Sequence, residues 1–148
     1  MRKAVVEIIC LAALGLALSL AGFAPAGHAD VANDRAAAMK EIRNSFRVLV
    51  GMAQAGEFDA SAVQNGAFAI VTELMIFKGL FPPGSQEADR ISRSEIWTDR
   101  AGFDAAWEAG DSAASDLGTV TSADAFVPAL QTLASACRSC HKKFVVPQ

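Results

Sequence analysis

Apolar side chains recur at steps of three and four residues along most of the chain beyond residue 32, which is the spacing of one face of an α-helix. The pattern predicts a first helix over residues 33–55, closed by Gly56. A second helix is predicted to begin after the N-cap Asp59 and to end at Gly79. The apolar stripes are Met39, Ile42, Phe46, Leu49, Val50 and Ala53 in the first helix, and Val63, Ala67, Ile70, Leu74 and Phe77 in the second.

A loop is predicted from residue 81 to about residue 94, because Pro82 and Pro83 exclude a continuing helix. After a turn at residues 94–97, a third helix is predicted from near Asp99 to Gly118. Its stripe is Phe103, Ala106 or Trp107, Gly110, Ala114 and Leu117.

The fourth helix is predicted to begin near Asp124, since Pro128 fits a first helical turn but clashes with a carbonyl when placed deeper. Its stripe is Phe126, Leu130, Leu133, Cys137, Cys140 and Phe144. Four helices of about 17–23 residues joined by mostly short connections predict an all-α, antiparallel up-down-up-down four-helix bundle.

The N-terminus has the three parts of an export signal. Arg2 and Lys3 precede an almost wholly apolar run over residues 8–24, and small residues at Gly27 and Ala29 suit a signal peptidase. We therefore expect residues 1–29 to be a cleaved signal peptide and residues 30–148 to be one domain with no membrane span. An uncleaved anchor is the alternative, because the run approaches the roughly 20 residues that cross a bilayer.

Charge and cysteine content narrow the function further. The chain has 13 basic and 16 acidic residues, a net charge of −3, which favours neither nucleic acid nor an anionic membrane as partner. Of its three cysteines and two histidines, Cys10 and His28 would leave with the signal. Every remaining thiol and imidazole then lies in one short segment near the C-terminus.

That segment is Cys137-Arg138-Ser139-Cys140-His141, the spacing that attaches a c-type haem with the histidine placed to ligate iron. On a helix the three side chains fall on one face. The motif predicts one covalent haem c. A zinc site would lack a fourth ligand, a thiol oxidoreductase places its cysteines where a strand meets a helix, and a disulfide here would constrain little. No other nucleophile or general base constellation suggests an enzyme.

Several segments, taken together, resemble the cytochrome c′ family of bacterial four-helix cytochromes. They are Arg35-x-x-x-Met39 with Phe46, Phe58-Asp59, Phe81-x-Pro83-Gly84-Ser85, Glu95-Ile96-Trp97-x-Asp99, and the haem motif followed by Phe144. The resemblance implies a periplasmic protein with one haem per chain, often a homodimer through its first two helices.

The resemblance also implies roles for single residues. Cys137 and Cys140 would hold the haem vinyl carbons as thioethers, and His141 would be the proximal iron ligand. Arg35 would pair with a haem propionate. Phe81 and Trp97 would line the haem edge, although both also suit an ordinary core.

Met39 matches the family position that faces the distal side of the haem. As a ligand it suits one-electron transfer with redox partner proteins, which is the function we expect. Without ligation the iron is five-coordinate, and the alternative is binding of small gases such as nitric oxide. Met52 lies ~20 Å further along the same helix and Met75 fits the second helix's packing, so neither replaces Met39.

One position departs from the family pattern. Members often carry a basic residue four positions after the ligand histidine, where this chain has Val145. A proximal gas-binding mechanism that uses such a charge would need Lys142 or Lys143 to reach round instead. These lysines also suit the C-terminal end of a helix dipole, or a docking patch for an acidic redox partner.

Overall fold

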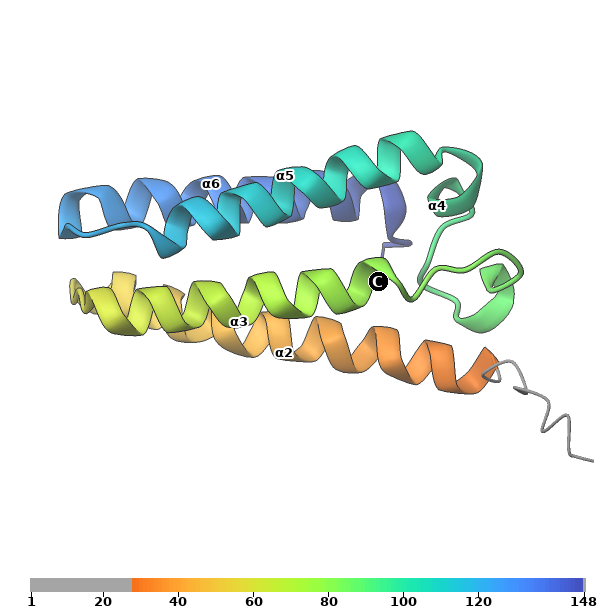
Figure 1. Ribbon diagram of the computed structural model, residues 1–148, viewed down its shortest axis with the longest axis horizontal. Helices are drawn as coiled ribbons and strands as arrows, with labels where there is room; N and C mark the ends of the chain where they lie inside the picture. Colours follow the sequence, from red (N-terminus) through yellow and green to blue (C-terminus); the bar gives the residue numbers. More distant parts are fainter. Residues whose placement is uncertain (1–27, 148) are drawn as a thin grey trace, which may run out of the picture.

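The computed structural model describes residues 28–147, so the predicted signal peptide lies almost wholly outside the described residues. Four long helices alternate in direction (Figure 1): α2 (His28–Ala55), α3 (Ala60–Lys78), α5 (Arg100–Gly118) and α6 (Ala123–Phe144). The connection between α3 and α5 carries a 3₁₀ turn, η1 (Gln86–Ala88), and a single helical turn, α4 (Glu95–Thr98). The predicted antiparallel four-helix bundle is confirmed.

Local capping explains most helix ends. The Asp59 carboxylate accepts hydrogen bonds from the backbone N–H groups of Ser61 (2.8 Å) and Ala62 (3.0 Å), and Asp99 accepts one from Gly102 N–H at 3.0 Å. Gly56, at φ 69°, adopts a left-handed conformation that suits glycine after the end of α2. These ends agree with the sequence prediction.

Two details of the helices differ from the prediction. α2 begins at His28 rather than near residue 33, because its first turns are helix-compatible and carry Asp30 at the positive end of the dipole. Residues 95–98 form a helical turn in which Thr98 N–H donates to Ser94 and Asp99 N–H donates to Glu95. One turn is too short to show a period in the sequence.

The prediction for Pro128 was wrong. α6 begins after the cap Ser122, so Pro128 lies inside the helix, beyond its first turn. Pro128 and Asp124 are both exposed. The Asp124 carbonyl that loses its helical partner is therefore close to water, which limits the destabilisation that a buried proline would cause.

The core has two parts. A long aliphatic part runs between the helices and includes Leu49, Ile70, Leu117 and Leu133. A smaller aromatic part lies at the end of the bundle that holds the α3–α5 connection, and it consists of Phe81, Ile96, Phe103 and Phe144. Edge-to-face contacts join Phe81 to Phe103 (centroids 5.1 Å apart) and Phe103 to Phe144 (5.4 Å).

The helices pack mainly against their neighbours in sequence. α2 lies on α3, α3 on α5 and α5 on α6, whereas α2 and α6 contact each other only sparingly. Within residues 28–147, the side of the bundle between α2 and α6 is therefore the most open one.

Candidate haem site

The face of α6 that enters the core continues into the haem motif. Phe126, Leu130 and Leu133 are buried along this face, and Phe144 is buried at its end. Cys137 and Cys140 lie between them on the same face, half-buried and as free thiols. The predicted stripe thus brings both cysteines to the inside of the bundle.

A cavity of about 790 Å³ opens beside these cysteines. Its wall includes Cys137, Cys140 and His141 from α6, and Arg35 and Met39 from α2. All five site residues predicted from the sequence therefore meet at one cavity. Most of the remaining wall is apolar, with Ile42, Phe46, Leu74, Phe77, Phe81, Ile96, Phe103 and Trp107 among its members.

The titratable groups of the motif favour their neutral forms. Burial raises the pKa of Cys137, and burial together with the neighbouring Cys137 raises the pKa of Cys140 to about 11. Burial lowers the pKa of His141, which favours the neutral imidazole that binds metals. Two thiols that can form thioether bonds, a neutral imidazole that can bind iron and an apolar wall fit a large, flat, mostly apolar iron porphyrin.

Arg35 is deeply engaged with the α3–α5 connection. It is only 3% exposed, and its guanidinium donates to the Leu80 carbonyl (2.9 Å), to Asp89 (2.7 Å), and to the carbonyl (3.2 Å) and hydroxyl (2.7 Å) of Ser85. The group also stacks on Phe81, with Cζ 4.3 Å from the ring centroid. These bonds use four of its five N–H groups, so pairing of Arg35 with a propionate remains a prediction.

The structure separates the two tryptophans. Trp97 is not part of the cavity wall, and its indole N–H donates to the Pro82 carbonyl at 3.1 Å. Trp107 lines the cavity instead, anchored by its N–H to the Leu74 carbonyl at 2.7 Å. Phe81 lines the cavity as predicted and also belongs to the aromatic core.

The structure also places four other residues that the sequence analysis singled out, two methionines and two lysines. Met52 packs against the aliphatic core, while Met75 is 65% exposed on α3 rather than packed as predicted. Of the two lysines, Lys142 lies on the cavity wall with Val145, whereas Lys143 pairs with Asp99 at 2.6 Å. Of these two lysines, Lys142 is therefore the one whose position on the cavity wall suits it to replace the basic residue that family members often carry at the position of Val145.

A backbone clamp fixes the loop side of the cavity. Arg93 N–H donates to the Phe144 carbonyl at 3.0 Å, Val146 N–H donates to the Ile91 carbonyl at 2.9 Å, and Ser92 forms a β-bridge with Val145. Residues 144–146 follow the haem motif directly, and residues 91–93 belong to the α3–α5 loop. The clamp therefore ties the end of α6 to this loop.

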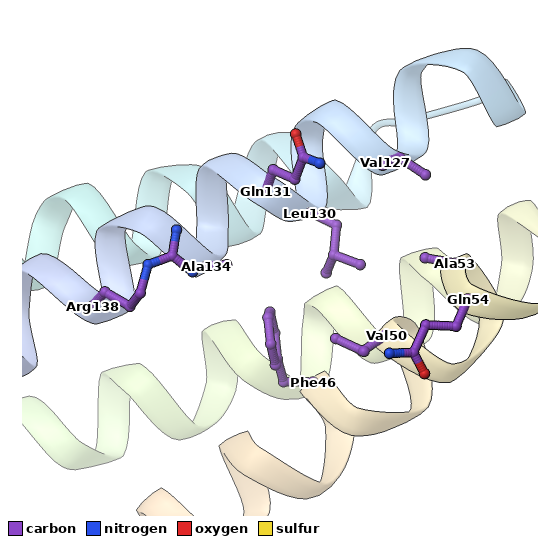
Figure 2. Close-up of a pocket in the computed structure, with 9 residues that line it drawn as sticks. All are labelled: Phe46, Val50, Ala53, Gln54, Val127, Leu130, Gln131, Ala134 and Arg138. Carbon is purple, nitrogen blue, oxygen red and sulfur yellow. The ribbon is translucent and has the colours of Figure 1, made fainter.

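An open apolar groove of about 410 Å³ adjoins the cavity between α2 and α6 (Figure 2). In Figure 2, Phe46 points from α2 toward α6 and Leu130 points from α6 toward α2. Phe46, Ala134 and Arg138 belong to the walls of both the groove and the cavity. The two spaces are therefore neighbours along the open side of the bundle.

Within residues 28–147, no cluster of three or more histidine, cysteine, aspartate or glutamate side chains could hold a metal ion. The donor set that a structural zinc site needs is thus not found in that part of the chain. The motif, the apolar cavity and the four-helix bundle define instead a c-type haem protein.

Comparison with known proteins gives the family. The family model of cytochrome c′ matches residues 30–145, and the chain belongs to this family, which binds covalent haem c. The cytochrome c′ structure from Rubrivivax gelatinosus is 27% identical with a TM-score of 0.72, and the match covers 80% of this chain and 97% of that one. No curated protein sequence matches the chain significantly.

Two further structures share the fold. Cytochrome c′ from Shewanella frigidimarina is 23% identical, with a TM-score of 0.73 over 82% of this chain and 98% of that one. A nitric oxide complex of a mutant cytochrome c′ from Alcaligenes xylosoxidans is also 23% identical, with a TM-score of 0.69 over the same shares.

Proposed function

We propose that this protein is an exported monohaem cytochrome that transfers single electrons, and that His141 and Met39 would be the residues that bind the haem iron. The observation that carries the proposal is that both side chains lie on the wall of one cavity, His141 from α6 and Met39 from α2. Within the described residues, no second histidine shares that wall. Met39 is the wall's only methionine in that range and supplies its one thioether donor.

The haem supplies the one-electron chemistry, and the chain's residues hold it and tune it. Cys137 and Cys140 attach it through thioether bonds. A methionine sulfur as second ligand raises the reduction potential. The apolar wall, with Phe46, Phe103 and Trp107, excludes water and keeps the surroundings of the iron similar in both oxidation states.

Export to the periplasm is part of the proposal. The family match begins at residue 30, directly after the predicted signal peptide, and members of the family are typically periplasmic. In an oxidising compartment two nearby thiols tend to form a disulfide. Attachment of both sulfurs to a haem as thioethers would prevent that oxidation permanently.

A second candidate function is binding of a small neutral gas at a five-coordinate iron. The apolar side chains around Met39 favour it, because an uncharged diatomic molecule loses little solvation on entering such surroundings. A mutant cytochrome c′ from Alcaligenes xylosoxidans, which shares the fold, is known in complex with nitric oxide. The two candidates differ in one bond, between Met39 sulfur and iron.

The protein is further proposed to be a homodimer through α2 and α3. Large apolar side chains are exposed on these helices: Val48 (64%), Phe68 (71%), Met75 (65%) and Ile76 (51%). α3 is also long and apolar enough to cross a membrane, with a mean hydropathy of 1.3, but Val63, Ala67, Ile70 and Leu74 pack it into the bundle. A second copy of the chain would cover its exposed face.

The experiment is an optical spectrum of the haem-loaded ferric protein, in wild type and in Met39→Ala. We expect a low-spin spectrum with a sulfur-to-iron charge-transfer band that disappears in Met39→Ala and persists in the control Met75→Ala, which changes an exposed methionine outside the cavity. A high-spin wild-type spectrum, unaffected by Met39→Ala, contradicts the electron-carrier proposal and favours gas binding. Release of the haem by acid-acetone extraction contradicts both.

A further inference from the structure

The rim of the haem cavity carries a group of cations whose charge no side chain balances. Four of them lie on the cavity wall in addition to Arg35: Arg43 from α2, Arg90 from the α3–α5 loop, and Arg138 and Lys142 from α6. All four are exposed. Among residues 28–147, none of the four forms an ion pair. We call these four residues the cationic rim.

Carboxylates are nearly missing from the same surface. Asp89 is the only acidic residue on the described cavity wall, and Arg35 neutralises it at 2.7 Å. α6 has no carboxylate after Asp124. The acidic residues closest in sequence to the rim, Asp34 and Glu41 on α2 and Glu87 in the loop, do not line the cavity. The rim is thus positive although the whole chain has a net charge of −3.

The cofactor does not remove this charge. A haem has two propionate carboxylates, so they balance at most two of the four rim cations. The remaining charge lies at exposed positions of the cavity wall, where a partner protein can reach it. Clustered charge of one sign raises the rate at which oppositely charged partners arrive by 10-fold or more at low ionic strength.

We propose that the cationic rim is the docking surface for the acidic face of a protein redox partner. This inference rests on the proposed electron-transfer function and adds the partner's chemistry to it. A single electron passes from the ferrous haem to the partner, with no bond made or broken. Contact at the rim places the partner beside the haem cavity, and charge complementarity orients it there.

Stopped-flow oxidation of the haem-loaded ferrous protein tests the proposal with three one-electron oxidants. They are hexacyanoferrate(III), which is an anion, tris(phenanthroline)cobalt(III), which is a cation, and an acidic plastocyanin. The variants are Arg43→Glu and Arg90→Glu. The control is the double variant Ala123→Glu with Ala125→Glu, which changes the net charge by the same amount on exposed positions at the start of α6, ~15 Å along the helix from Ala134 in the cavity wall.

Each rim variant is expected to slow oxidation by hexacyanoferrate(III) and by plastocyanin about 10-fold at low ionic strength and to accelerate oxidation by the cobalt cation. Both effects should vanish near 1 M salt. A changed haem potential would move all three rates in one direction and so overturn the proposal. It is also overturned by an equal effect in the control at the start of α6, or by slowing with hexacyanoferrate(III) alone, which would mean a small-anion site.

These rates do not require Met39 ligation, because a five-coordinate haem also donates an electron to each oxidant. A high-spin spectrum would therefore contradict the proposed function, but the oxidation rates would still test the docking surface. Unchanged rates in the rim variants together with a low-spin spectrum would contradict the docking surface and support the proposed electron-transfer function.

Discussion

Arg35 offers the sharpest test of how the loop over the haem cavity is held. We consider Arg35→Ala in the haem-loaded protein. The substitution removes one hydrogen bond to a carboxylate and three to neutral oxygens, and it leaves Asp89, with a side chain 13% exposed, and the buried Ser85 without their partner.

The magnitude follows from these contacts. The guanidinium donor of all four bonds is charged, and a hydrogen bond to a charged group contributes about 1.5–3 kcal/mol. Breaking a buried ion pair by removing one partner usually costs about 3–5 kcal/mol, which limits the sum. We therefore expect Arg35→Ala to lower the free energy of unfolding by about 4 kcal/mol, and Arg35→Lys by about half as much, because an amine cannot span Leu80, Ser85 and Asp89 together.

The assay is urea unfolding followed by far-UV circular dichroism. With a slope of about 2 kcal/mol per molar urea, Arg35→Ala should lower the midpoint by about 2 M. Arg100→Ala is the matched control, because Arg100 also pairs with an aspartate, Asp104 at 3.1 Å, but both side chains are about 40% exposed. We expect that control to change stability by less than about 1 kcal/mol.

Equal losses in Arg35→Ala and Arg100→Ala would refute this reasoning. They would mean that the guanidinium does not hold the loop in the loaded protein. Arg35 would then be free to serve a haem propionate alone, which is the role that the family resemblance implies.

Two further predictions concern Asp89 and the oligomer. Burial would raise the pKa of Asp89, but hydrogen bonds from Arg35, Ser92 and Ile91 lower it below its usual 3.8. The contribution of Asp89 to stability is therefore complete above its pKa in the unfolded chain and is lost as pH falls through the lower folded pKa. Wild type should then lose more unfolding free energy between pH 5 and 3 than Asp89→Asn. In sedimentation analysis, Phe68→Glu should convert the dimer to a monomer, whereas Val127→Glu on α6 should leave it dimeric. If both variants remained dimers, the result would contradict an interface through α2 and α3.

The sequence predicts a helix end wherever the signal is local. Asp59 and Asp99 bond to N–H groups only two or three residues away, so their capping can be inferred from neighbouring residues alone. The start of α2 could not be predicted, because its first turns have no apolar stripe. The depth of Pro128 in α6 was predicted wrongly, because the rule against interior proline does not include exposure of the freed carbonyl.

The candidate site also has one part that the sequence predicts and one part that it does not. The haem motif is contiguous in the chain, so its residue types and spacing indicate haem attachment without knowledge of the fold. The environment of Arg35 is not contiguous, since its partners lie 45 to 54 residues away in the chain. The choice between Trp97 and Trp107 also depends on how α5 packs against α3, which periodicity does not specify.

The sparse contact between α2 and α6 has a consequence for folding. The other three pairs of long helices join segments that follow one another in the chain, so these pairs can associate rapidly. Among the four long helices, only the closure of α2 against α6 requires a long loop to form. The cavity has walls on both helices, so a molecule held there adds to the sparse contact between them. The unloaded chain should therefore open first along this side, and cofactor attachment should lock the fold as well as complete the site.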